Sequence, residues 1–298
     1  MTLFHHLPSL LLLLLLLSPP SSSSLPLPST VLPHSTSTAP PLILLHGLFG
    51  TSSNLSTLAR TLSSDRTVHS LTLRNHAGAP RHFDMSFDAL ASDVAEYMTD
   101  NGIGKAVIIG HSIGGKVAMA LATGEFSKMV DGVIVVDIAP VEYAAGDGSG
   151  WSSIASTISS CISLPLSQLP DRRAADAALA LEIPDPSLRA FVLASATRRP
   201  PMSWLADVPA LSASLETLAS FPSPRGRSPF AGDAYFVAGG NSKFVKSSHV
   251  PAIAELFPSN MIVSVRGAGH WVHAESPNDV AGLVRRYLER ERRVEDRG

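Results

Sequence analysis

Residues 105–120 read KAVIIGHSIGGKVAMA, and the rest of the chain is best interpreted outward from this stretch. A β-branched apolar segment leads through Gly-x-Ser-x-Gly into an alanine-rich segment, which is the order that a nucleophile elbow requires. The pattern predicts a buried strand, a sharp turn with Ser112 in a strained backbone conformation, and a helix beginning at Ile113. Gly110 and Gly114 flank the serine because side chains there would collide where strand and helix nearly touch. We therefore interpret Ser112 as a nucleophile rather than as part of an ordinary glycine-rich turn.

Composition limits what this chain can be. It has 298 residues, a formal net charge of −2 at pH 7 and a single cysteine, Cys161. With a net charge this close to zero, electrostatics does not favour binding to nucleic acid or to an anionic membrane. One cysteine cannot form an intrachain disulfide, which mildly disfavours a secreted protein.

Residues 1–40 are set apart from the fold as a targeting leader. They contain the run Leu10–Leu17 and then a stretch rich in proline, serine and threonine. Eight leucines are too few to cross a bilayer, which needs about 20 apolar residues, but they suit the apolar part of a signal peptide. The serine-rich, acid-free composition also fits an organelle transit peptide, although such peptides normally carry arginine. We expect this segment to be disordered, and membrane association is not indicated beyond it.

Strand and helix patterns alternate along the remaining residues. Apolar runs predict strands at 42–45, 67–73, 130–136, 234–238 and 261–265, and a further strand directly before the Gly-x-Ser-x-Gly turn, with helical spacing between most of them. This alternation predicts an α/β fold with a mostly parallel central sheet and helices on both faces. Residues 141–229 carry only alanine-rich helical pieces and predict an inserted helical cap. The core is then 41–140 together with 230–298.

A serine nucleophile needs a base, and the base needs an orienting carboxylate. Because the carboxyl ends of parallel strands gather at one edge of a sheet, both partners should directly follow strands. His270 follows the last predicted strand in a glycine-rich loop and is the candidate base. Asp137 follows the strand 130–136 and is the candidate acid, with Asp207 and Asp233 as alternatives.

Supporting roles fall to residues near these three. The N–H groups of Ile113 and Leu48 are the candidate oxyanion donors, with Phe49 as the alternative to Leu48. Phe49 and Trp271 are expected to line the substrate pocket. His111 is expected to support the elbow, and His273 to pack, since no carboxylate or cysteine cluster accompanies the His-x-x-His spacing. No metal or organic cofactor is required.

Six blocks carry a resemblance to a known family. They are HGLFG (46–50), RNH (74–76), GHSIGGK (110–116), VDIAP (136–140), GGNS (239–242) and AGHWVHAESP (268–277). Together they resemble the α/β-hydrolase domain-containing protein 11 family and the bacterial YbfF-type esterases. The resemblance implies an α/β-hydrolase fold, serine ester hydrolysis, Asp137 as the acid, and Ser242 as a hydrogen-bond support for the acid–histidine pair.

The N-terminus departs from this family. Its members usually have a hairpin before the His-Gly strand, whereas here only the leader precedes Pro41. The strand 67–73 is then expected to be an unprotected edge. Animal members are mitochondrial, which favours an organelle, mitochondrion or plastid, over a secretory route.

The resulting functional hypothesis is a serine carboxylic ester hydrolase. It would act on a small-molecule ester with a small or medium acyl group, through a Ser-His-Asp triad and an acyl-enzyme. The alternatives are a thioesterase or lipase with the same triad, and a ligand receptor with residual hydrolase activity.

Overall fold

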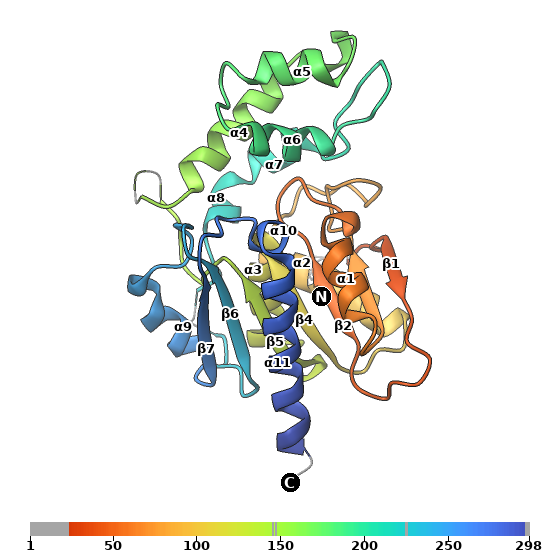
Figure 1. Ribbon diagram of the computed structural model, residues 1–298, viewed down its shortest axis with the longest axis vertical. Helices are drawn as coiled ribbons and strands as arrows, with labels where there is room; N and C mark the ends of the chain where they lie inside the picture. Colours follow the sequence, from red (N-terminus) through yellow and green to blue (C-terminus); the bar gives the residue numbers. More distant parts are fainter. Residues whose placement is uncertain (1–23, 145, 147, 224–225, 296–298) are drawn as a thin grey trace, which may run out of the picture.

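A computed structural model describes residues 24–295 except 145, 147, 224 and 225 (Figure 1). The leucine run at 10–17 lies outside the described residues. No helix among those that are described is long and apolar enough to cross a membrane.

A seven-stranded sheet forms the centre of the molecule, in the order β1-β3-β2-β4-β5-β6-β7. The strands are β1 (Ser29–Leu32), β2 (Leu42–Leu45), β3 (Val68–Leu71), β4 (Ala106–His111), β5 (Val130–Val136), β6 (Ala234–Gly239) and β7 (Asn260–Val265). All neighbours pair in parallel except β1 and β3. The mostly parallel α/β sheet predicted from the strand and helix patterns is confirmed.

Helices surround the sheet and form the cap. In the core they are α1 (Ser56–Leu62), α2 (Phe87–Asp100), α3 (Ile113–Thr123), α9 (Val250–Leu256), α10 (Val272–Glu275) and α11 (Pro277–Glu295), with 3₁₀ turns at Ser52–Leu55, Ser127–Met129 and Ser247–His249. The cap holds α4 (Trp151–Ser163), α5 (Arg172–Leu179), α6 (Pro186–Ala194), α7 (Val208–Ala213) and α8 (Leu215–Ala219), with a 3₁₀ turn at Leu166–Gln168.

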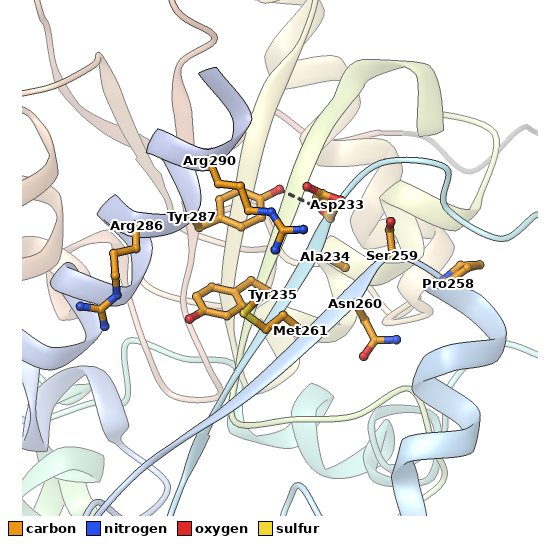
Figure 2. Close-up of a pocket in the computed structure, with 10 residues that line it drawn as sticks. All are labelled: Asp233, Ala234, Tyr235, Pro258, Ser259, Asn260, Met261, Arg286, Tyr287 and Arg290. Atoms are coloured by element: carbon orange, nitrogen blue, oxygen red, sulfur yellow. Dashed lines mark hydrogen bonds between the residues drawn. The ribbon is translucent and has the colours of Figure 1, made fainter. Parts of the chain in front are cut away.

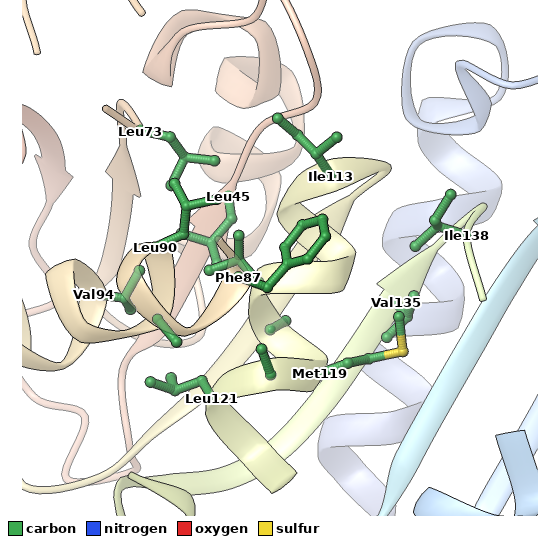
Figure 3. Packing of buried hydrophobic residues seen from close by; sticks show 14 of the residues in the cluster. Leu45, Leu73, Phe87, Leu90, Val94, Ile113, Met119, Leu121, Val135 and Ile138 are labelled. Carbon is green, nitrogen blue, oxygen red and sulfur yellow. The ribbon is translucent and has the colours of Figure 1, made fainter. Parts of the chain in front are cut away.

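The central strands are buried on both faces, so their side chains alternate between two apolar layers. In β4, Ile108 belongs to the layer packed against α2 and α3, while Val107 and Ile109 belong to the layer packed against α1 and α11. Figure 3 shows the first layer, in which Phe87 and Leu90 of α2 pack near Leu45 of β2. Each strand is therefore fixed from both sides, and the loops at its carboxyl end start from a rigid position.

Residues 141–229 leave the core after β5 and return before β6. Their helices lie above the carboxyl edge of the sheet, at the top of Figure 1. They include a small apolar cluster of their own, built around Leu166, Leu179 and Met202. Among the described residues of this segment, the one β-type pairing is an isolated bridge between Ala196 and Trp204.

The edge expected to be open is covered, so that prediction was wrong. β1 pairs antiparallel with β3, with Ser29 opposite Leu71 and Leu32 opposite Val68. Part of the segment set apart as a leader therefore belongs to the sheet. This strand could not be predicted from the sequence, because three of its four residues are exposed and the strand shows no apolar alternation.

Candidate active site

Ser112 occupies the turn between β4 and α3, as the elbow motif predicted. Its φ of 53° and ψ of −122° confirm the strained conformation expected there. Strand and helix cross so closely that a Cβ on Gly110 would lie 2.1 Å from the carbonyl oxygen of Gly114. The turn thus places the serine at the carboxyl edge of the sheet. The residues that directly follow β5 and β7 lie at the same edge.

The structure brings Ser112, His270 and Asp137 into one hydrogen-bonded chain. His270 Nε2 lies 3.1 Å from Ser112 Oγ, and His270 Nδ1 lies 2.8 Å from Asp137 Oδ2. Because a carboxylate can only accept, Nδ1 carries the proton and Nε2 is free to accept from the serine hydroxyl. The His270 side chain is 14% exposed and Asp137 is fully buried. This is the geometry that a base-activated serine requires.

Asp137 is held in place from the neighbouring strand. Its Oδ1 accepts from the Gly239 N–H at 2.8 Å, and Ser242 Oγ donates to its Oδ2 together with His270. Ser242 in turn accepts from the Phe244 N–H at 3.2 Å. Three donors satisfy the buried carboxylate, and they fix its orientation toward His270.

The two alternative acids lie elsewhere. Asp207 caps α7 by accepting from the Ala210 N–H, and its carboxylate is 3.5 Å from Arg81. Asp233 precedes β6, at the opposite edge of the sheet from Ser112. Neither is hydrogen-bonded to His270.

His111 lies beneath the base. Its Nε2–H donates to the His270 carbonyl at 2.9 Å, and its ring contacts that of His273 at 4.4 Å between centroids. Burial lowers the pKa of His111 well below its usual value, and the neighbouring histidines add to this effect. His111 is therefore neutral and holds the His270 loop, while His273 packs behind it.

The loop 46–50 lies against the elbow. A Cβ on Gly47 would lie 3.2 Å from the Ser112 Cβ, so the backbone approaches the serine directly. His46 anchors the loop, because its Nε2 accepts from the Leu73 N–H and its Nδ1–H donates to the Gly47 carbonyl. Leu48 lies in this loop and lines the cavity in front of the serine, and Ile113 directly follows the serine as the first residue of α3. First-turn amides of a helix have no intrahelical acceptor, so the Ile113 N–H can serve an oxyanion.

A cavity of about 240 Å³ opens in front of Ser112. The core supplies Leu48, Phe49, His111, Phe244, His270 and Trp271, and the cap supplies Gly150, Ser153, Ile154, Thr157, Asp185 and Leu188. Phe49 and Trp271, proposed from the sequence as pocket residues, do line it.

Sequence reasoning missed Phe244 and the cap residues. Four of the cap residues, Gly150, Ser153, Ile154 and Thr157, have the spacing of one helix face, with Gly150 as the N-cap of α4. Only Ile154 is apolar, so no apolar periodicity marks this face in the sequence.

A larger depression of about 510 Å³ lies at the other edge of the sheet, between α11 and the starts of β6 and β7 (Figure 2). There Tyr235 stacks on Tyr287, whose hydroxyl donates to the Asp233 carbonyl at 2.9 Å. It contains none of the three hydrogen-bonded residues, so the smaller cavity is the candidate active site. Within the part of the chain that the structure describes, no cluster of histidine, cysteine and carboxylate side chains could hold a metal ion.

Comparisons with known proteins agree with this geometry. The model described as "Alpha/beta hydrolase family" matches residues 42–283. The chain belongs to the alpha/beta hydrolase family. It is 34% identical over 268 residues to the mouse "sn-1-specific diacylglycerol lipase ABHD11", covering 88% of this chain and 86% of that protein. It is 33% identical over 249 residues to "Esterase YbfF" of Escherichia coli, covering 83% and 92%.

A solved structure supports the assignment of the fold. The chain superimposes on "Marine microorganism esterase" with a TM-score of 0.82 at 29% identity, covering 88% of this chain and 98% of that one. The resemblance stated from six sequence blocks is therefore confirmed. This alpha/beta hydrolase has relatives named as esterases and lipases, which makes it an enzyme of the carboxylic ester hydrolase class.

Proposed function

We propose that this chain hydrolyses carboxylic esters of small or medium acyl groups, with Ser112, His270 and Asp137 as its catalytic triad. The observation that carries the proposal is the continuous hydrogen-bonded chain from Ser112 through His270 to a fully buried Asp137. That chain ends in a largely apolar cavity, where an acyl group can bind next to the serine.

The reaction follows from these positions. His270 Nε2 takes the proton of Ser112 as the serine oxygen attacks the ester carbonyl. Asp137 stabilises the imidazolium that forms. The Leu48 and Ile113 N–H groups hold the oxyanion, and a donor of this kind is worth about 3 kcal/mol in the transition state. His270 then protonates the departing alcohol, leaving the acyl group on the serine.

Water completes the cycle. His270, neutral again, takes a proton from a water molecule as that water attacks the acyl-enzyme, and the serine recovers its proton when the acid leaves. No step requires a metal or cofactor.

Cavity size sets the expected acyl length. At roughly 30 Å³ for each water-sized group, about 240 Å³ holds about eight such groups. Acyl chains of up to about eight carbons should fit on that estimate, and longer chains must leave through the mouth of the cavity.

The test is hydrolysis of p-nitrophenyl esters of increasing acyl length by the full chain and by Ser112→Ala. Turnover with a clear optimum in chain length, abolished in the variant, is the expected result. A folded chain with no turnover on any ester would overturn the proposal. Acyl-thioesters and an emulsified diacylglycerol, the substrate named for the mouse relative, belong in the same panel because they separate an esterase from a thioesterase or a lipase.

A further inference from the structure

Lys116 ends the block GHSIGGK, and the proposed reaction gives it no role. It lies on α3, one turn after Ser112, and its side chain is almost completely buried. Burial lowers its pKa to about 7, although Glu142 acts in the opposite sense. A lysine is costly to bury, and a methionine would fill the same space without desolvating an amine. The contacts of the amine must therefore explain why a lysine occupies this buried position.

The amine binds backbone carbonyls from two separate segments. Nζ donates to the Val141 carbonyl at 3.1 Å and, within 3.3 Å, to the carbonyls of residues 218, 219 and 220. It also lies over the rings of Phe87 and Tyr143, 5.5 and 4.8 Å from their centroids. Among the described residues no carboxylate comes within ion-pair distance of it. An ammonium has three N–H donors and no lone pair, so it suits a site made of carbonyl oxygens better than a neutral amine, which has two donors and a lone pair.

Those two segments are the connections between core and cap. Residue 141 lies where the chain leaves β5 for α4, and residues 218–220 lie where it returns from α8. The connections also touch each other, because the Tyr143 N–H donates to the Ala219 carbonyl at 3.1 Å. Figure 1 shows α8 at the base of the cap, next to the body of the molecule. Lys116 thus joins both connections to the helix that carries the nucleophile.

A second set of contacts runs from this crossing to the base. The Tyr143 hydroxyl donates to the Phe244 carbonyl, and the two rings meet at 5.5 Å. The Phe244 ring lies 4.2 Å from that of His270. The point where the cap is attached is therefore packed against the wall of the active site.

We propose that Lys116 is a positioning residue that fixes the cap over Ser112 by binding the carbonyls of both connections. The cap supplies the acyl-cavity wall around Ser153, Ile154 and Leu188, so its position sets how well a longer acyl chain is bound. An acetyl group is too short to depend on that wall. Lys116 accordingly governs the binding of longer acyl groups and leaves the chemical step alone, an inference that rests on the proposed esterase function.

The test compares Lys116→Met with the wild type on acetyl and hexanoyl esters. We expect KM for the hexanoyl ester to rise by about fivefold or more with kcat within about twofold, and the acetyl ester to be nearly unaffected. Lys116→Gln, whose amide NH₂ group keeps two N–H donors, should lie between Lys116→Met and the wild type. Lys128→Met is the matched control, because Lys128 is an exposed lysine outside the site, and it should behave as wild type.

Hydrogen exchange separates failure of this inference from failure of the esterase function. In Lys116→Met, amides of residues 139–144 and 214–222 should exchange about tenfold faster, while those of β4 stay protected. The exchange measurement tests the contacts of Lys116 even if the chain hydrolyses no ester. Unchanged exchange in both connections, equal loss of kcat on both esters, or failure of both Lys116 variants to fold would each overturn the proposal, the last two by assigning Lys116 to general stability.

Discussion

Replacing Asp137 by asparagine keeps the shape of the side chain and removes its charge. The Gly239 N–H donates to Oδ1, so the asparagine oxygen must stay at that position. The new NH₂ group then takes the place of Oδ2, facing Ser242 Oγ and His270 Nδ1. An NH₂ group donates, so it selects the tautomer of His270 with its proton on Nε2. That nitrogen lies 3.1 Å from Ser112 Oγ and can no longer accept the serine proton.

The expected loss of kcat is large because His270 can no longer act as a base, even though the fold is preserved. The same exchange in a protease triad lowers kcat by about 10⁴. At about 1.4 kcal/mol for each factor of ten, this corresponds to about 5.5 kcal/mol of transition-state stabilisation. KM should change little, because Asp137 does not line the cavity.

The assay is ester hydrolysis at saturating substrate, with circular dichroism as a check of folding. Asp207→Asn and Asp233→Asn are matched controls, since both were alternative acids and neither touches His270. Both should retain near wild-type kcat. A folded Asp137→Asn that keeps more than about a tenth of wild-type kcat would refute the reasoning.

Three further predictions concern stability and the acyl cavity. Asp93→Ala removes the carboxylate that lies 2.6 Å from the buried Arg74 guanidinium. The free energy of unfolding, measured by urea titration, should fall by about 3–5 kcal/mol, and an unchanged midpoint would contradict this. Burial lowers the pKa of His46 to about 3 and that of His76 to about 4, whereas an unfolded histidine has a pKa of about 6.5. Between pH 6.5 and about 4, these two histidines therefore bind protons in the unfolded chain but not in the folded one. Stability should therefore fall as pH drops from 6.5 toward 4, by up to roughly 1.4 kcal/mol per pH unit for each histidine, and a flat profile in thermal scans would argue against it. Ile154→Trp fills the acyl cavity and should lower kcat/KM for a hexanoyl relative to an acetyl ester by about tenfold, which the ester series measures.

The sheet and the elbow could be predicted because their patterns are local. The run 42–45 is apolar at every position and is bounded by Pro41 and His46-Gly47, and it forms β2 with those bounds. Gly-His-Ser-Ile-Gly was readable because the crossing of strand and helix requires glycine. His270 and Asp137 followed from one geometric rule, that the carboxyl ends of parallel strands meet at one edge.

Other features depend on contacts that no local pattern records. Lys116 is the one charged residue of α3, and three of its carbonyl partners, in residues 218–220, are more than a hundred residues away in the sequence. The face of α4 that lines the cavity has one apolar residue, Ile154, between Ser153 and Thr157, and what it contacts depends on how the cap is attached. The pairing of Arg74 with Asp93 likewise joins a loop to a helix, and charge alone does not single it out.

The placement of β1 constrains how this polypeptide could be matured. The Leu25 N–H donates to Asp93 at 2.6 Å, Leu27 is buried, and β1 follows at once. A processing protease that cut near residue 40 would strip these contacts and expose the backbone of β3, a ready template for association between chains. Cleavage before Leu25 would leave the sheet intact. The position of a single cut would thus decide between a well-folded hydrolase and an aggregating one.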